Sequence, residues 1–147
     1  MIREITENKR DFLPLLLLAD EQEDMIDRYL DRGRMFVLED NGIVKGECVV
    51  TDEGDGLLEI QNLAVAEAFQ GKGYGRMLIE YVSGLFSSQF SELQAGTGDS
   101  PLTIPFYERC GFTRHHTIRN FFPDHYGHPI FEAGKQLIDK IYFRKKL

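Results

Sequence analysis

Three glycines stand on alternate positions directly before a helical pattern in the stretch QGKGYGRMLIEYV, which runs from Gln70 to Val82. Glycine costs backbone entropy at the start of a helix, so a feature other than helix propensity must favour it there. A helix start exposes unpaired N–H groups, and glycine, which lacks Cβ, lets the oxygens of an anion approach them closely. The stretch therefore indicates either a pyrophosphate site or a glycine-rich turn before a packed helix, and the glycines alone do not decide between them.

Two common glycine motifs do not fit this stretch. A P-loop has Lys and then Ser or Thr after its last glycine, whereas Arg76 and Met77 follow Gly75 here. The dinucleotide fingerprint is GxGxxG within a βαβ unit, whereas this run is GxGxG and follows a meander of antiparallel strands. Neither a P-loop enzyme nor a Rossmann domain is therefore predicted.

Helices and strands are predicted on both sides of the glycine run. Residues 3–5 are a candidate short strand, and residues 11–19 and 21–32 are predicted helices, the second of which ends at Gly33. The strands MFVLED and IVKGECVV flank Asn41-Gly42, which favours a tight hairpin, and a turn at 52–56 leads into LLEIQNLAV. The later elements are SELQAGTG as a strand, PLTIPFYERC as a short helix, and FTRHHTIRNFF and LIDKIYFR as strands. With no linker or internal repeat, residues 1–147 are predicted to form a single domain.

Charge and hydropathy limit the partners of the chain. Seventeen Lys and Arg against 24 Asp and Glu give a net charge of −7, which disfavours nucleic acid and favours cationic partners. The longest aliphatic run, Leu15 to Leu18, is too short to cross a bilayer, so we predict no membrane partner and a cytoplasmic location. Cys48 and Cys110 lack the spacing of metal ligands and are expected to be reduced thiols.

Two motifs of this chain resemble those of the GNAT superfamily, the acetyl-CoA-dependent N-acetyltransferases. Gln70-Gly71-Lys72-Gly73-Tyr74-Gly75 resembles the signature (Gln/Arg)-x-x-Gly-x-(Gly/Ala), and FYERCGF, Phe106 to Phe112, resembles the second signature. The order of elements is similar over nearly the whole chain. The resemblance implies an α+β (α/β) fold, with a mixed, mostly antiparallel sheet of about six to seven strands and about four flanking helices. It also implies that LLEIQNLAV and SELQAG run parallel and splay apart to form the acetyl-CoA cleft.

The resemblance also implies how acetyl-CoA is bound. Backbone N–H groups of residues 71–76 would hold the pyrophosphate, and main-chain atoms of Leu63 and Val65 would pair with the thioester and pantetheine arm. Lys72 and Arg76 either add charge near the phosphates or are solvated side chains. Where many relatives have an Asn for pantetheine this chain has Asp99 and Ser100, and Ser100 is also a good N-cap. The expected coenzyme-binding residues are Leu63, Ala64, Val65, Gln70, Gly71, Lys72, Gly73, Tyr74, Gly75, Arg76 and Ser100.

Two catalytic residues follow from the resemblance and the chemistry of acyl transfer. Tyr107 falls on the tyrosine that is the general acid of many relatives, and its alternative role is that of a core aromatic. Glu59 is a candidate base, because strict alternation places it with Gln61, Leu63 and Val65 on the strand face that lines the cleft. Its alternative role is a strand carboxylate that faces solvent or pairs with a cation. A backbone N–H at Leu63 is expected to stabilise the oxyanion.

The acceptor site is expected in the late loop RNFFPDHYGHPIFEAGK and between the early helices. In this family that loop often borders the acceptor, although a solvated loop is the simpler alternative. The candidate substrate-binding residues are Glu21, Asp24, Asp124, His125, Tyr126 and Glu132, and Glu21 and Asp24 are also fallback bases. His115, His116, His125 and His128 lack the spacing of a zinc site, so no metal is predicted.

These observations predict an acyltransferase that moves the acetyl group of acetyl-CoA directly to the primary amine of a small molecule or peptide. The alternative is a GNAT-fold acyl-CoA sensor or interaction module that binds the coenzyme without turnover. Both need the glycine site, but only the enzyme needs Tyr107 and a route for the amine proton. The sequence does not identify the acceptor, and a monomer and a homodimer both remain open.

Overall fold

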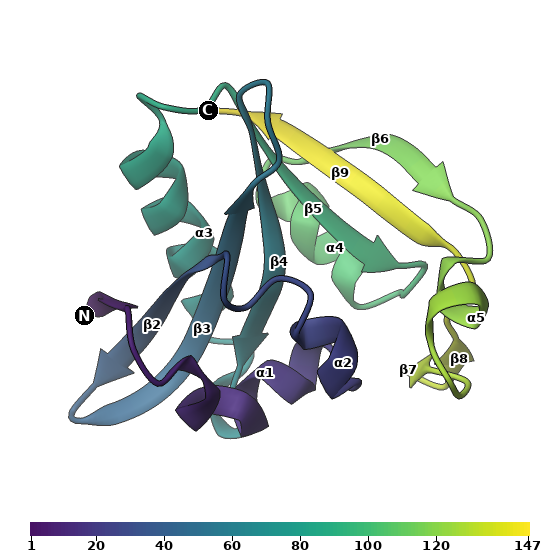
Figure 1. Ribbon diagram of the computed structural model, residues 1–147, viewed down its shortest axis with the longest axis horizontal. Coiled ribbons are helices and arrows are strands. Elements are labelled where there is room, and N and C mark those ends of the chain that lie inside the picture. The colour runs from purple at the N-terminus through teal and green to yellow at the C-terminus, as the bar shows by residue number, and fades with distance from the viewer.

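The structure is a computed structural model that describes residues 1–147. Its centre is a seven-stranded sheet in the order β1-β2-β3-β4-β5-β9-β6, while β7 and β8 form a separate two-stranded sheet (Figure 1). The mixed, mostly antiparallel α+β fold that the sequence predicts is confirmed. The strands are β1 Ile2–Ile5, β2 Arg34–Asp40, β3 Ile43–Asp52, β4 Leu57–Val65, β5 Glu92–Gly98, β6 Thr113–Ile118, β7 Phe131–Glu132, β8 Lys135–Gln136 and β9 Lys140–Lys146.

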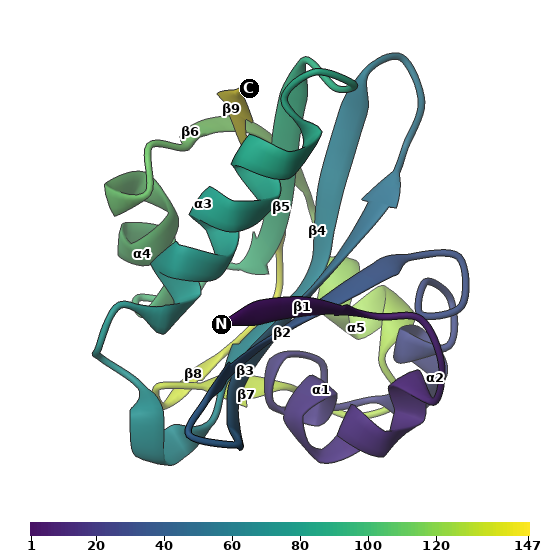
Figure 2. The ribbon, with the colours of Figure 1, turned by 90° about the vertical axis from the view of Figure 1, so that its left-hand side faces the viewer.

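Helices cover both faces of the sheet, which separates α3 and α4 from α1 and α2 (Figure 2). On the first face α3 packs Leu78, Val82 and Phe86 into the larger core, while Tyr81 and Leu85 of the same helix are exposed. None of the helices has the length and apolar character that crossing a bilayer requires. The helices are η1 Lys9–Phe12, α1 Leu13–Ala19, α2 Glu23–Ile26, η2 Glu67–Phe69, α3 Tyr74–Phe86, α4 Thr103–Arg109 and α5 Phe121–His125.

Two local predictions have different outcomes in the first third of the chain. The hairpin at Asn41-Gly42 is confirmed, because the two residues have φ of 53° and 75° between β2 and β3. The predicted helix over residues 21–32 is wrong in length, since α2 spans only Glu23–Ile26 and turns follow. The turns bury Tyr29 and Leu30 against the sheet and bring Gly33 so close to β3 that an added Cβ would lie 2.7 Å from Cγ1 of Val49.

The strands β4 and β5 form the only parallel pair of the sheet, and they splay apart as predicted. They are paired from Leu57 with Glu92 to Ile60 with Ala95. Beyond these residues β4 continues to Val65 and β5 to Gly98 without pairing, and the two strands diverge in Figure 1. Backbone groups of both strands are therefore left free along the opening between them.

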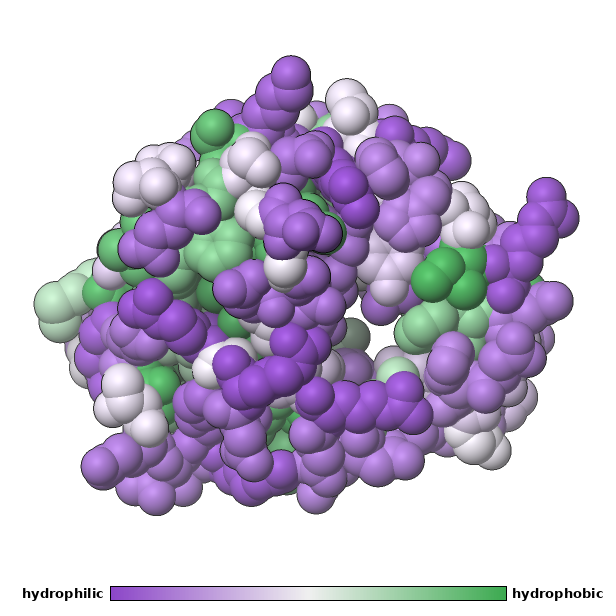
Figure 3. Space-filling view, turned by 45° about the horizontal axis from the view of Figure 1, so that its top comes forward, coloured by the Kyte–Doolittle hydropathy of each residue, from purple (hydrophilic) through white to green (hydrophobic).

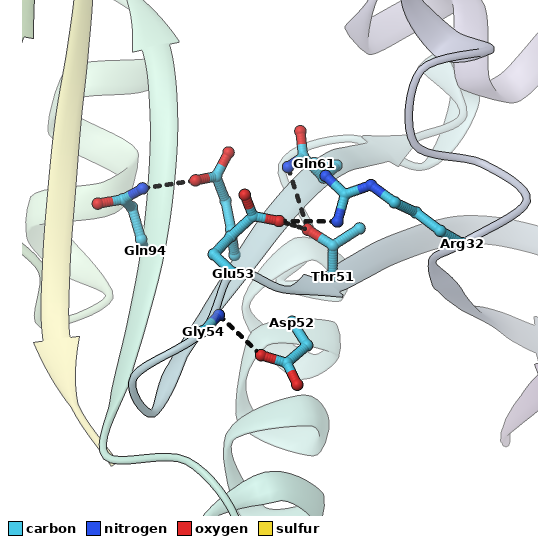
Figure 4. Close-up of polar contacts among 8 residues, drawn as sticks. Arg32, Thr51, Asp52, Glu53, Gly54, Gln61 and Gln94 are labelled. Carbon is cyan, nitrogen blue, oxygen red and sulfur yellow. Dashed lines mark hydrogen bonds and ion pairs between the residues drawn. The ribbon is translucent and has the colours of Figure 1, made fainter.

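A β-bulge in β4 changes which side chains share a face. Val49 pairs with Asn62 and Val50 with Ile60, so that Gln61 has no partner residue on β3. The prediction that Glu59, Gln61, Leu63 and Val65 share one face is therefore wrong. Glu59 and Asn62 lie on the face that α1 covers, and Leu63 lies on the opposite face with Cys48. In Figure 4 the side chain of Gln61 points toward Thr51, to which its Nε2 donates at 3.1 Å.

Candidate active site

A cleft of about 730 Å³ lies at the opening between β4 and β5 and is lined by residues from both faces of the sheet. Figure 3 shows the surface hollowed between the part at the right, which carries β6 and α5, and the rest of the molecule. We call the part lined by Phe69, Gln70, Gly71, Gly73, Tyr74, Gly75, Arg76, Phe106 and Tyr107 the glycine half. The polar half is the part lined by Asp20, Glu21, Asn62, Tyr126, Glu132 and Lys140.

The glycine half is built around the start of α3. Gly71 and Gly73 have φ of 77° and 88°, and a Cβ at either position would have no atom within 4 Å. The N–H of Met77 donates to the carbonyl oxygen of Gly73 at 3.0 Å, and the N–H groups of the preceding turn have no such helical partner. Nε2 of Gln70 donates to the carbonyl oxygen of Val65 at 2.9 Å and so holds the loop against the end of β4. This geometry can bind an anion through backbone N–H groups.

The predicted coenzyme-binding side chains do not all reach this cleft. Arg76 lines it and forms an ion pair with Glu80 at 3.1 Å. Lys72 is exposed outside the lining, with its Nζ over the ring of Phe69. Ser100 is fully buried outside the lining, where its Oγ accepts the N–H of Leu102 at 3.1 Å. The hydroxyl of Ser100 therefore supports the turn before α4.

Tyr107 combines a core position with access to the cleft. Its ring stacks on Phe143 and meets Phe106 and Phe112 edge to face, at centroid distances of 6.0, 5.2 and 5.4 Å. The residue lines the cleft, and no hydrogen bond of its hydroxyl to the protein is present. Burial raises the pKa of the Tyr107 hydroxyl, which therefore holds its proton at neutral pH. The two alternative roles of the residue, core aromatic and proton donor, are compatible.

Asp20 is the central carboxylate of the polar half, and sequence reasoning missed it. Its Oδ1 accepts the hydroxyl of Tyr126 at 2.7 Å, and its Oδ2 accepts the hydroxyl of Tyr29 at 3.2 Å. Nδ2 of Asn62 donates to the hydroxyl oxygen of Tyr29 at 3.0 Å, which connects this network to β4. Burial raises the pKa of the Asp20 carboxyl, although the two tyrosine hydroxyls oppose the shift. The only sign of Asp20 in the sequence was the break between the two predicted helices, residues 11–19 and 21–32.

The early helices and the late loop lie side by side, as predicted. Besides the bond from Tyr126 to Asp20, the N–H of Gly127 donates to Oε1 of Gln22 at 3.1 Å, and Nε2 of His128 lies 3.4 Å from Oε1 of Glu21. Among the six candidate acceptor residues, Glu21, Tyr126 and Glu132 line the cleft. The other three, Asp24, Asp124 and His125, do not line it.

Glu59 lies near the cleft but does not line it. It is 7% exposed, and its Oε1 accepts Nε2 of Gln94 at 2.5 Å. Oε1 of Gln94 in turn accepts Nε of Arg144 at 2.7 Å. Burial raises the pKa of the Glu59 carboxyl, against the opposing hydrogen bond from Gln94 and the charge of Lys140. Ile60 and Gln61, which follow Glu59 in β4, do line the cleft. A water molecule would therefore be needed to connect the Glu59 carboxyl to the cleft.

No histidine lines this cleft, and of the two cysteines only Cys110 does. No group of three or more His, Cys, Asp or Glu side chains is arranged to hold a metal ion. Nδ1 atoms of His115 and His116 lie 2.8 Å apart on the exposed strand β6. Cys48 is buried and Cys110 half-buried, and neither forms a disulfide.

Comparisons with known proteins agree with this architecture. Residues 31–114 match the family described as "Acetyltransferase (GNAT) domain". The chain is 33% identical over 137 residues to "Uncharacterized N-acetyltransferase YvbK" of Bacillus subtilis (strain 168), a match that covers 92% of this chain and 88% of that protein.

Two solved structures are similar over the full length. A GNAT family acetyltransferase from Elizabethkingia anophelis with acetyl-CoA bound has a TM-score of 0.94 and 33% identity, covering 100% of this chain and 97% of that one. "IAA acetyltransferase" from Bacillus cereus ATCC 14579 has a TM-score of 0.91 and 35% identity, covering 100% and 99%. This chain belongs to the GNAT family of acetyltransferases.

Proposed function

We propose that this acetyltransferase transfers the acetyl group of acetyl-CoA directly to a primary amine. The observation that carries the proposal is the cleft between β4 and β5, which joins an anion-binding helix start to a half-buried carboxylate on the other face of the sheet. The Elizabethkingia anophelis structure with acetyl-CoA bound supports this choice of donor.

The coenzyme lies in the glycine half. The N–H groups of residues 71–76 bind its pyrophosphate, because the glycines leave them open and the start of α3 favours a negative charge. The free edge of β4 at Leu63, Ala64 and Val65 pairs with the pantetheine arm and holds the thioester at the opening between the strands. Gln70, Tyr74 and Arg76 complete this half of the cleft.

The acetyl group is transferred at the opening. The lone pair of the neutral amine attacks the thioester carbonyl carbon, a C–N bond forms, and the C–S bond breaks. The N–H of Leu63 stabilises the oxyanion that develops, and the hydroxyl of Tyr107 gives its proton to the leaving thiolate. The amine nitrogen loses its second proton as the amide forms, and this proton restores the hydroxyl of Tyr107. A phenol whose proton is retained at neutral pH and whose hydroxyl has no protein partner suits this role.

Asp20 removes the proton from the acceptor ammonium. It lines the cleft, and its raised pKa makes it a better proton acceptor than an exposed aspartate. Glu59 is the second candidate base and would act through water, because it does not line the cleft. Glu21, Glu132 and Tyr126 surround the position of the amine.

Thiol release from acetyl-CoA tests the proposal. The purified protein is assayed with polyamines, amino acids, aminoglycosides and peptide N-termini, and calorimetry measures acetyl-CoA affinity in parallel. We expect release that depends on an amine and saturates with it. Tight binding of acetyl-CoA without release for any amine would contradict an enzyme and favour a coenzyme-binding sensor.

A further inference from the structure

Lys140 places a positive charge in the polar half of the cleft, and no carboxylate of the protein is paired with it. It is the first residue of β9 and the only lysine among the residues that line the cleft. Its Nζ lies 4.5 Å from the ring centroid of Phe121 and 4.9 Å from that of Tyr142. The ammonium forms no hydrogen bond or salt bridge, whereas that of the half-buried Lys45 is paired with Asp40 at 3.2 Å. A half-buried ammonium with only ring faces beside it lacks the anion that usually accompanies such a group.

The sheet is shaped to admit this side chain. A Cβ added at Gly96 of β5 would collide with Cε of Lys140 and would lie 2.8 Å from Cε1 of Tyr142. Glycine at this position is therefore needed for the lysine stem to cross β5 and reach the cleft. Gly96 and Lys140 both line the cleft, so the lysine side chain meets the cleft beside this glycine.

The carboxylates of Asp20 and Glu59 influence the pKa of Lys140, although neither forms a salt bridge with it. Burial lowers the pKa of the Lys140 ammonium, and the charges of Glu59 and Asp20 oppose this shift. Asp20 accepts hydrogen bonds from two tyrosine hydroxyls, and Glu59 accepts one from the side-chain amide of Gln94, so each carboxylate has partners other than Lys140. The polar half therefore offers carboxylate groups for a cation and one ammonium for an anion.

We propose that Lys140 binds a carboxylate of the acceptor, so that the preferred acceptors carry both an amine and a carboxylate. The amine lies toward Asp20 and Glu21, and the carboxylate lies toward Lys140. This inference rests on the proposed acetyl transfer, because it names the acceptor class of the same site. The competing explanation is that Lys140 only balances the charges of Asp20 and Glu59, in which case the acceptor needs no carboxylate.

Matched pairs of acceptors separate the two explanations. Phenylalanine is compared with phenethylamine, and lysine with cadaverine, by the kcat/KM of thiol release. We expect the carboxylate-bearing member of at least one pair to be preferred in the unmodified protein. Lys140→Met, which keeps the length of the stem, should lower kcat/KM for that acceptor by about tenfold to a hundredfold, the value of a charged hydrogen bond. The loss should lie in KM, and the KM for acetyl-CoA should not change.

Three further variants keep the test decisive. Gly96→Ala should give the same selective loss by displacing the lysine stem, and Lys140→Arg should retain part of the preference. Lys146→Met, an exposed position on the same strand, should change nothing. Equal losses for both members of a pair, or no preference in the unmodified protein, would overturn the inference while leaving the acetyltransferase intact. Absence of thiol release with every amine would instead overturn the proposed function together with the inference.

Discussion

The two halves of the cleft are built from the chain in different ways. The glycine half takes most of its lining from one short stretch, Phe69 to Arg76, and from α4. The polar half gathers side chains from distant segments, as the hydrogen bond between Asp20 and Tyr126, 106 residues apart, illustrates. In the proposed function, one half binds through backbone groups that follow from the path of the chain, and the other through side chains that meet only in the folded molecule.

If the proposed function holds, this difference separates recognition of the acetyl donor from recognition of the acceptor. Backbone N–H groups are present whatever the side chains are, so a helix start preceded by glycines keeps its affinity for phosphate through many substitutions. The polar half depends on individual carboxyl, hydroxyl and ammonium groups, so single substitutions there alter the choice of acceptor. Variants of the two halves should therefore have separable effects on the two substrates.

The largest effect is expected from Gly73→Glu in the glycine half. A glutamate at this position would direct a carboxylate at the pyrophosphate and abolish measurable binding of acetyl-CoA in calorimetry. Gly54→Glu is the matched control, because Gly54 also has φ of 88°, also has open space around a Cβ, and lies outside the cleft. Both variants should lose a similar stability of about 1 to 3 kcal/mol, as positive φ implies for a non-glycine residue. Unchanged acetyl-CoA affinity in folded Gly73→Glu protein would contradict the assignment of this half.

Tyr107→Phe should reduce turnover by about a hundredfold to ten-thousandfold, since the proton donor is lost and the packing of the ring is kept. Steady-state kinetics should show the loss in kcat, and calorimetry should show an unchanged affinity for acetyl-CoA. Full activity would assign Tyr107 to the core alone, where its contacts with Phe112 and Phe143 already hold it.

Asp20→Asn should lower kcat/KM by about a hundredfold, the lower end of the range for a general base. The carboxylate must be ionised to accept a proton, so activity should rise with pH through its pKa, which burial raises. The acidic limb of the pH profile should therefore disappear in Asp20→Asn. Asp24→Asn, which lies outside the cleft, is the control. If the limb persists in Asp20→Asn and disappears in Glu59→Gln, the base is Glu59.

The smallest effect concerns the charge around the polar half. Glu132→Gln should raise the KM for an amine acceptor a few-fold at low salt, and the effect should shrink as the screening length falls to about 8 Å at physiological ionic strength. Asp124→Asn should leave this KM unchanged, because Asp124 does not line the cleft. Equal effects of the two substitutions would mean that the net charge of the loop, and not its position, attracts the amine.

The sequence predicted the glycine half better than the polar half for a physical reason. The glycine run, the strand before it and the helix after it are neighbours along the chain, so their arrangement follows from local propensity and spacing. Asp20 is an aspartate at the end of a helix without a motif, and Lys140 looks like an ordinary strand residue. Their roles depend on Tyr126, Gly96 and other residues that only the tertiary fold brings near.

The error at Glu59 has an equally specific cause. Alternation along a strand assumes one residue per step, and the bulge at Gln61 adds a residue that no pattern in LLEIQNLAV reveals. After this extra residue the alternation is shifted by one position, so that Leu63 lies on the opposite face of the strand from Glu59. A prediction of strand faces from sequence therefore holds only up to the first bulge.

The opening between β4 and β5 reaches both faces of the sheet, and this has a consequence for the order of events in catalysis. In the proposed function the coenzyme approaches from the side of α3 and α4, and the acceptor from the side of α1 and α5. Neither substrate blocks the route of the other, so either can bind first and either product can leave first. We therefore expect a random sequential mechanism, in which initial-rate plots intersect and each product competes with the substrate that uses its own side of the sheet.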